Sequence, residues 1–230
     1  MTRALIGILA LDTAFPRIPG DVGNAETWPF PVRIATVSGA TPGRVVHDRA
    51  QGLFEAFVAA GNQLAGQGVA TIVTTCGFLA LVQQELAAAL PVPVATSALL
   101  QAPLIARTLP AGRRVGIITA SERALTPAHL AAAGADPATP VVGVAEGGAF
   151  SRTFVGNGTA LDVAAAEADV LAESDRLLSE HADIGAILLE CANMGPYAAA
   201  VRAATSLPVH DMVGFVHWLH GALVPRVFKR

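Results

Sequence analysis

The sequence repeats one local pattern twice, and the two cysteines of the chain mark the two copies. An apolar run, VATIVTTC in the first copy and IGAILLEC in the second, ends at Cys76 and at Cys191. A stretch of helical character follows each thiol, and Pro93 and Pro208, each 17 residues beyond its cysteine, open the next apolar run. The repeat is much too long for a solenoid, so it predicts two stacked lobes that each present a thiol at a strand end.

The apolar runs are short, continuous and rich in valine and isoleucine, as buried strands of parallel sheets are. They predict strands at residues 5–11, 32–37, 71–75, 92–95, 115–119, 141–144, 186–189 and around 209. Helical stretches lie between them, at residues 47–67, 78–90, 98–108, 126–133, 161–181, 194–205 and 213–224. This alternation predicts an α/β fold of two pseudo-symmetric lobes, each a short, mostly parallel sheet flanked by helices.

The repeat also suggests how the chain divides. We expect residues 1–97 to form an N-terminal α/β lobe and residues 98–211 a C-terminal one. The last helix, within residues 212–230, lies outside the repeat and is expected to pack back on the N-terminal lobe.

Two long irregular segments interrupt the pattern. Residues 12–31 are rich in proline and glycine, and residues 146–159 are rich in glycine. Segments of this length are often binding loops or lids. The second leads into a helix, for which Asn157 or Thr159 is the expected cap.

Composition narrows the class of protein. With 53% hydrophobic residues, the 230-residue chain can bury a large core. The net charge of −3 gives no basic patch, so we expect no nucleic-acid partner. No run of about 18 uncharged apolar residues predicts a membrane span. The only lysine is Lys229, next to the C-terminus, so a pyridoxal Schiff base has no plausible buried lysine.

The cysteines and the N-terminus indicate a compartment. Two cysteines 115 residues apart are not the disulfide framework of a secreted protein. The opening MTRALIGILALDTAF is a poor signal peptide, because its apolar run ends at Asp12 and is better explained as a strand. We therefore expect a cytoplasmic protein with both thiols reduced.

A thiol at a strand end and a helix start faces unpaired N–H groups and the positive end of the helix dipole. Both are expected to lower its pKa. The alternative is that each cysteine is a small buried hydrophobe. Two cysteines at matching repeat positions favour a catalytic pair, and the absence of a Cys-x-x-Cys motif argues against thiol–disulfide chemistry.

The segments IGIL, TIVTTC, AILLEC and LPVHD resemble the aspartate/glutamate/hydantoin racemase superfamily, which also includes maleate isomerases and arylmalonate decarboxylases. The resemblance covers most of the chain and is strongest around the cysteines. It implies a two-lobed fold with the active site between the lobes. It also implies cofactor-independent racemisation in which one cysteine is the base and the other the acid. By position these are Cys76 and Cys191, and the presence of both favours a racemase or epimerase over a single-cysteine decarboxylase.

The residues after each cysteine depart from that family. Amino-acid racemases usually have asparagine and then serine or threonine after the first cysteine, where this chain has Gly77 and Phe78. The second is usually followed by threonine, where this chain has Ala192 and then Asn193. The acidic residue after the first strand is not matched in spacing, although Asp12 is near. We therefore expect the proton-transfer pair to be retained and the substrate to differ from glutamate and aspartate.

Several residues are candidates for binding a substrate carboxylate or carbonyl. They are backbone N–H groups at a helix start, hydroxyl or acidic groups at strand ends, an arginine able to pair bidentately, and residues beside the second thiol. The set is Asp12, Arg17, Thr75, Gly77, Phe78, Thr119, Ser121, Ala192 and Asn193. The alternative for each is a helix cap, a turn residue or a solvated loop charge.

One acid stands out because Glu190 precedes the second thiol on a buried strand. A buried acid is costly unless it is paired, so we expect it either to orient a neighbour or tune the thiol, or to make a structural hydrogen bond. Histidines 210, 217 and 220 lack a supporting cysteine or carboxylate spacing, so no metal site is expected.

The function favoured by these patterns is a pyridoxal-independent racemase or epimerase, an isomerase acting on an amino acid or a derivative such as a hydantoin. Two alternatives stay open: a maleate-type cis–trans isomerase on the same scaffold, and a small-molecule binding protein without turnover. We expect a small substrate that bears a carboxylate or carbonyl, no cofactor, and a homo-oligomer, dimeric or larger.

Overall fold

The computed structural model describes residues 5–228, so Lys229 lies outside it. Within these residues eight strands form two four-stranded sheets, in which every pairing is parallel. The first sheet, in the order β2-β1-β3-β4, contains β1 (Ile6–Leu11), β2 (Val32–Val37), β3 (Thr71–Thr74) and β4 (Val94–Ala95). The second, in the order β6-β5-β7-β8, contains β5 (Arg114–Thr119), β6 (Val141–Gly143), β7 (Ile184–Leu189) and β8 (Val209–His210). The predicted two-lobed α/β fold is confirmed, and both lobes share one strand order.

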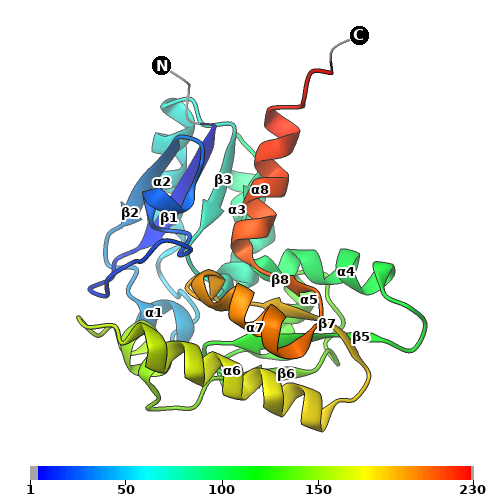
Figure 1. The fold of residues 1–230 in the computed structure, drawn as a ribbon. Coiled ribbons are helices and arrows are strands. Elements are labelled where there is room, and N and C mark those ends of the chain that lie inside the picture. The colour runs from blue at the N-terminus through cyan, green and yellow to red at the C-terminus, as the bar shows by residue number, and fades with distance from the viewer. Residues whose placement is uncertain (1–4, 229–230) are drawn as a thin grey trace.

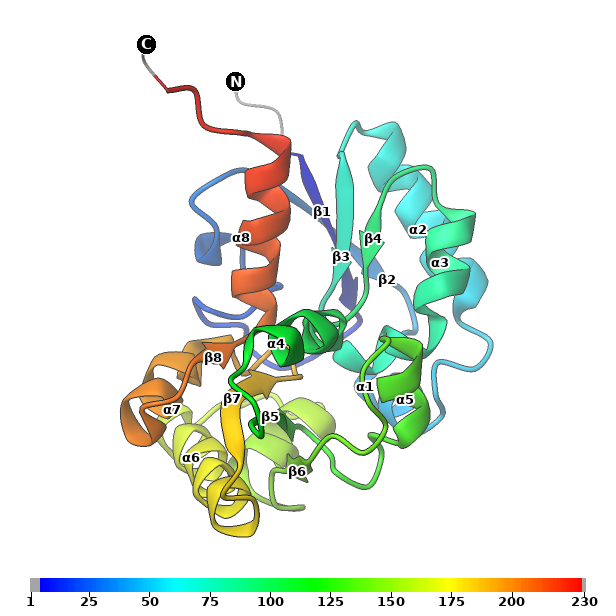
Figure 2. The same ribbon diagram turned by 90° about the vertical axis from the view of Figure 1, so that its right-hand side faces the viewer.

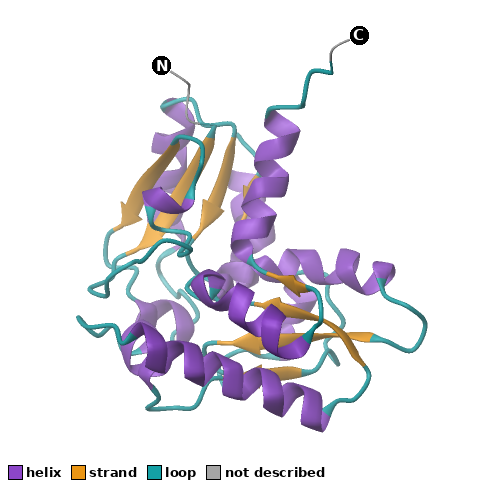
Figure 3. Ribbon diagram, in the orientation of Figure 1, coloured by secondary structure: helices purple, strands orange, loops and turns teal. Residues whose placement is uncertain are grey.

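Helices flank both sheets (Figure 3). They are α1 (Pro42–Val46), α2 (Phe54–Gly66), α3 (Gln83–Ala89), α4 (Ala102–Thr108), α5 (Pro127–Ala132), α6 (Val163–Glu180), α7 (Ala198–Thr205) and α8 (Met212–Leu223). Short 3-10 turns at Ala25–Thr27, Gly77–Val82, Ala98–Gln101 and Gly195–Tyr197, and a π turn at Ser151–Val155, complete the set. No helix among the described residues is both long and apolar enough to cross a bilayer.

Three local predictions need correction. The helix predicted from residue 47 begins at Phe54, because Arg49 and Ala50 have φ angles of 54° and 55°, which a right-handed helix does not accept. Part of the glycine-rich segment 146–159 forms the π turn. Helix α6 is capped by Asp162, whose carboxylate accepts from the Ala165 N–H at 3.0 Å, and not by residue 157 or 159.

The two lobes stand at a large angle to one another, and α8 runs alongside the first sheet (Figures 1 and 2). The helix contacts the N-terminal half through aromatic rings: the His220 ring stacks on Phe30 with centroids 3.7 Å apart, and His217 lies 5.8 Å from Trp28. The predicted boundary after residue 97 falls between β4 and β5. The division into two domains stays a prediction.

The register of the sheets makes the two cysteine positions equivalent. Thr75 and Glu190 are the next residues after β3 and β7, and their N–H groups donate to Leu9 and Ile118 at 3.1 and 2.9 Å. Each thiol follows one residue later. Both thiols therefore lie past the carboxyl ends of inner strands, where parallel sheets bind their ligands.

Segment 12–31 crosses from the first lobe to the second. The Val22 N–H donates to the Ala192 carbonyl at 3.4 Å, and the Gly20 carbonyl oxygen lies so close to Gly195 that a Cβ there would overlap it. Because both groups at this crossing are backbone, they cannot yield by rotating a side chain.

We therefore predict that Gly195→Ala lowers the free energy of unfolding by about 1–3 kcal/mol, as overpacking does. Gly221→Ala is the matched control, because Gly221 lies in helix α8 with no atom within 4 Å of an added Cβ. That change should raise stability by up to about 1 kcal/mol. Urea denaturation of both variants measures the difference, and a neutral effect at Gly195 would contradict the close approach.

Candidate active site

The two thiols line one small cavity between the lobes. Its volume is about 20 Å³, room for about one water molecule. Both cysteines are free and buried, each 8% exposed. The lining residues are Leu11, Phe15, Pro42, Val46, Thr75, Cys76, Gly77, Phe78, Ala120, Phe154, Val155, Cys191 and Asn193. A substrate therefore needs the site to widen, although the two thiols already share it.

The structure brings four of the nine residues predicted to bind substrate to the thiol cavity and leaves the other five outside it. Besides the thiols, the cavity contains Thr75, Gly77, Phe78 and Asn193. Asp12 and Arg17 do not line it: the Asp12 carboxylate accepts from the Gly39 N–H at 3.0 Å, and Arg17 pairs within segment 12–31. Thr119 and Ala192 also stay outside, engaged with Glu190 and with Val22.

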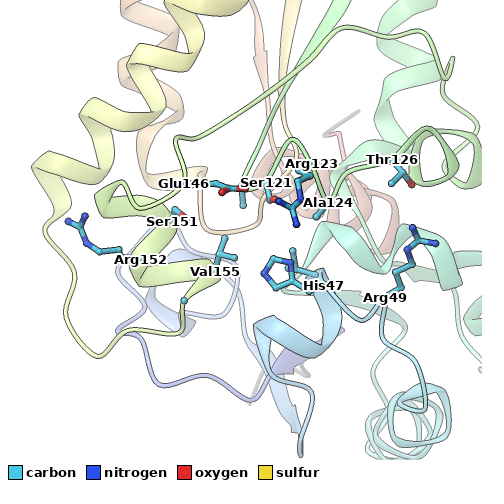
Figure 4. A pocket seen from close by; sticks show the side chains of 13 residues that line it. His47, Arg49, Ser121, Arg123, Ala124, Thr126, Glu146, Ser151, Arg152 and Val155 are labelled. Carbon is cyan, nitrogen blue, oxygen red and sulfur yellow. The ribbon is translucent and has the colours of Figure 1, made fainter.

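A wider cavity of about 570 Å³ opens beside the thiol cavity and contains Ser121. Val46, Ala120 and Val155 line both, so the two spaces adjoin. Figure 4 shows the His47 and Arg123 side chains extending toward one another there. Its wall carries Arg49, Arg123 and Arg152 against one acid, Glu146, so this outer cavity is basic.

A hydrogen-bond chain reaches the second thiol from segment 12–31. The Cys191 thiol donates to Asn193 Oδ1 at 3.5 Å, and Asn193 Nδ2 donates to Asp21 Oδ2 at 2.6 Å. Asp21 Oδ1 in turn accepts from Arg17 at 2.8 Å. The guanidinium also lies 4.8 Å above the Phe15 ring. These hydrogen bonds fix the direction in which the Cys191 thiol hydrogen points.

The predicted lowering of the thiol pKa values is wrong for the closed site. Burial, followed by the charge of Glu190, raises the pKa of Cys76 to about 12, against the weaker effects of the Phe78 and Leu79 N–H groups and of Arg17. Burial and Glu190 also hold the pKa of Cys191 well above its usual value. Both thiols are therefore protonated when the cavity is empty.

The second thiol does not stand at a helix start, contrary to the prediction. The 3-10 turn after Cys76 begins at the next residue, Gly77, whereas the turn after Cys191 begins only at Gly195. The N–H that lowers the pKa of Cys191 is that of Asn193 alone. The two thiols thus have different surroundings in spite of the repeat.

Glu190 is fully buried and lies against Gly77 of the cavity wall. Its Oε2 accepts from the Thr119 hydroxyl at 2.8 Å, but its Oε1 has no hydrogen-bond partner among the described residues. Burial raises its pKa to about 7, against the hydrogen bonds from Thr119 and from the Ala120 N–H. One of the two oxygens of this carboxyl group therefore stays without the expected partner.

Aromatic rings form much of the cavity wall. Phe15 and Phe154 meet edge to face with centroids 5.0 Å apart, and Phe78 also lines the cavity. Phe15, Phe154 and Asp21 were missed in the sequence, since all three come from segments without periodicity. The alanine-rich and glycine-rich surroundings of Phe154 gave no signal.

Among residues 5–228 no group of three histidine, cysteine or acidic side chains is placed to hold a metal ion. The surroundings of the thiols instead consist of apolar walls, amide groups and one carboxyl group. They suit proton transfer at a carbon next to a carboxylate or carbonyl.

Comparison with solved structures identifies the fold. Allantoin racemase from Pseudomonas fluorescens matches with a TM-score of 0.63 and 17% identity, covering 98% of this chain and 99% of that one. A Gly-to-Cys mutant of arylmalonate decarboxylase matches with a TM-score of 0.61 and 19% identity, over 97% and 95% of the two chains. Picrophilus torridus aspartate racemase gives 0.60 and 12%, over 97% and 96%. The chain has the fold of the aspartate/glutamate/hydantoin racemase superfamily, as predicted.

Sequence comparison finds relatives that are named for another activity than racemisation. A dimethylsulfoniopropionate lyase of Durusdinium sp. clade D is 29% identical over 222 residues, which is 92% of this chain and 72% of that protein. Dimethylsulfoniopropionate lyase 7 of Emiliania huxleyi is 30% identical over 219 residues, or 90% of this chain, which spans only 64% of that relative. No protein-family model matches the chain. These similarities support an enzyme, and the activity named for the sequence relatives is that of a lyase and not of an isomerase.

The raised pKa of Glu190 predicts a pH-dependent stability. Between pH 4.5, the usual pKa, and about 7, this carboxyl group is protonated in the folded protein and ionised in the unfolded one. The free energy of unfolding of wild type therefore falls as pH rises through that window. Glu190→Gln has no such loss. The difference in free energy of unfolding, variant minus wild type, should therefore increase by up to about 3 kcal/mol between pH 4 and pH 8. Denaturant titrations at several pH values measure the gap, and a constant gap would contradict the burial of an uncompensated acid.

Proposed function

We propose that the protein is a cofactor-independent enzyme that removes a proton next to a carboxylate, and that the reaction is elimination of dimethyl sulfide from dimethylsulfoniopropionate. The observation that carries the proposal is the pair of buried thiols on one aromatic-walled cavity. The two relatives described above support the choice of substrate, and the racemase fold supports α-proton chemistry.

The elimination balances with one base. A thiolate takes the proton from the carbon next to the carboxylate, the electrons of that C–H bond form the C=C bond, and the C–S bond breaks. Dimethyl sulfide leaves with the C–S electron pair, acrylate is the other product, and the proton ends on the thiol. A desolvated thiolate is a stronger base than an exposed one, which suits the buried position of both cysteines.

The substrate itself supplies the charge that the empty site lacks. A dimethylsulfonio group is a cation, and a cation near a thiol favours its ionised form. The rings of Phe15, Phe78 and Phe154 suit a methylated cation, since the faces of aromatic rings attract such groups. Binding of the sulfonium thus brings the pKa of the reacting thiol down from its raised value.

Racemisation of a small carboxylate is the second candidate, favoured by the presence of two thiols where an elimination needs one base. A maleate-type isomerisation is the third chemistry on this scaffold and proceeds through a thioether adduct. In D₂O a racemase exchanges the α-hydrogen without releasing sulfide, and an isomerase forms the adduct without exchange. Headspace gas chromatography and NMR in D₂O therefore separate the three reactions.

Serine substitution assigns the two thiols. We predict that one of the two variants, Cys76→Ser or Cys191→Ser, lowers kcat for dimethyl sulfide release by about 10²–10⁴-fold, the usual contribution of a general base. The other variant should lower kcat less. Racemisation would instead be abolished by both changes. Circular dichroism confirms folding, and lyase activity left intact in both variants would exclude the thiols as bases.

The composition of the cavity wall predicts substrate preference. No charged side chain of the described residues lines the thiol cavity, so a second carboxylate would meet apolar rings without a partner. We expect kcat/KM for dimethylsulfoniopropionate to exceed that for D- or L-glutamate in a panel that also contains hydantoins. Glutamate as the best substrate of the panel would contradict this interpretation of the wall.

A further inference from the structure

The feature that the proposed mechanism leaves unused is the half-paired carboxyl group of Glu190. It is 1% exposed and reaches from the end of β7 to the first lobe. Its Oε1 lies against Gly77, where a Cβ would overlap it, so this oxygen fills the space in which a side chain at position 77 would begin. Gly77 is the residue directly after Cys76 and lines the thiol cavity.

The surroundings of Glu190 favour its neutral form. None of the ion pairs among the described residues includes it. The ionisable groups that it faces are the two thiols, and an ionised carboxylate would oppose ionisation of both. From segment 12–31, Arg17 acts on Cys76 and Asp21 acts on Cys191, but neither contacts this acid. An ionised carboxylate here would have hydrogen bonds but no counter-ion.

The position of the proton follows from the hydrogen bonds. Oε2 accepts from the Thr119 hydroxyl. In a neutral acid that keeps this hydrogen bond, the proton lies on Oε1. Oε1–H is then a buried donor without an acceptor in the closed site. A donor of this kind is costly to keep unless a ligand uses it.

We propose that Glu190 works as a neutral acid whose Oε1–H donates a hydrogen bond to the substrate carboxylate, in the space that a side chain at position 77 would otherwise fill. The inference rests on the proposed function only for the class of substrate, a small carboxylate. It accounts for Gly77: the glycine leaves room for a donor that comes from the opposite lobe. The cavity widens when the substrate enters, and a carboxylate bound over Gly77 then comes within reach of Oε1.

The test is the binding of propionate, a carboxylate without a leaving group, measured by calorimetry from pH 5.5 to 8.5. Wild type should bind propionate more weakly as pH rises, by about tenfold for each unit above the pKa of Glu190, because ionisation removes the donor and adds a repelling charge. Glu190→Gln keeps an acceptor for Thr119 and a donor at the free position. Its dissociation constant should therefore not change through this window, and at pH 8 it should bind about tenfold more tightly than wild type.

Two further variants complete the design. Glu190→Leu removes the donor and should weaken binding about tenfold or more at pH 6. Glu173→Gln is the matched control, because Glu173 is a buried acid of the same lobe that pairs with Arg176 at 2.6 Å, on α6. It should leave propionate binding unchanged. If the leucine variant does not fold, the pH dependence of wild type against the glutamine variant decides alone.

The outcomes separate this inference from the proposed function. Equal binding by wild type and Glu190→Leu, or a pH dependence that persists in Glu190→Gln, would overturn the role of Glu190 even in an active lyase. Propionate binding that depends on Glu190 would support it even if the protein released no dimethyl sulfide.

Discussion

The burial of three ionisable groups in one apolar space is the constraint on which the site depends. Cys76, Cys191 and Glu190 come from the ends of β3 and β7, and no arginine or lysine among the described residues pairs with any of them. Each of the three is pushed toward its neutral form by desolvation. Burial thus disfavours charge in the empty site, and a charged substrate changes that balance when it binds.

Segment 12–31 keeps this space closed. It covers the thiols with Phe15, carries the Asp21 carboxylate to Asn193, and rests by its backbone on Gly195. Helix α8 holds the far end of the segment through Trp28 and Phe30. Because the inner cavity has room for about one water molecule, the segment or its neighbours must move before a substrate can reach the thiols.

The sequence was sufficient for the fold and for the placing of the two cysteines at equivalent strand ends, but not for the environment of the thiols. Continuous apolar runs and the repeat are local signals, so all eight strands were found. The predicted pKa direction was wrong because it depends on burial by residues distant in sequence, such as Phe15 and Phe154 of the cavity wall. Arg17 and Asp12 are predicted near the substrate, but Arg17 pairs with Asp21 and the Asp12 carboxylate accepts from the Gly39 N–H. The site assignments, the homo-oligomer and the cytoplasmic location stay predictions.

The repeat is broken around the two thiols, and this supports the proposed elimination over a racemisation. A racemase takes a proton from either face of a carbon and benefits from two similar bases. Here the residue before the thiol is Thr75 in one lobe and Glu190 in the other. Cys76 is approached by the N–H groups at the start of a 3-10 turn, whereas the Cys191 thiol is tied through Asn193 to Asp21. Two thiols so differently placed suit unlike roles, which fits the proposed elimination, because that reaction needs only one base.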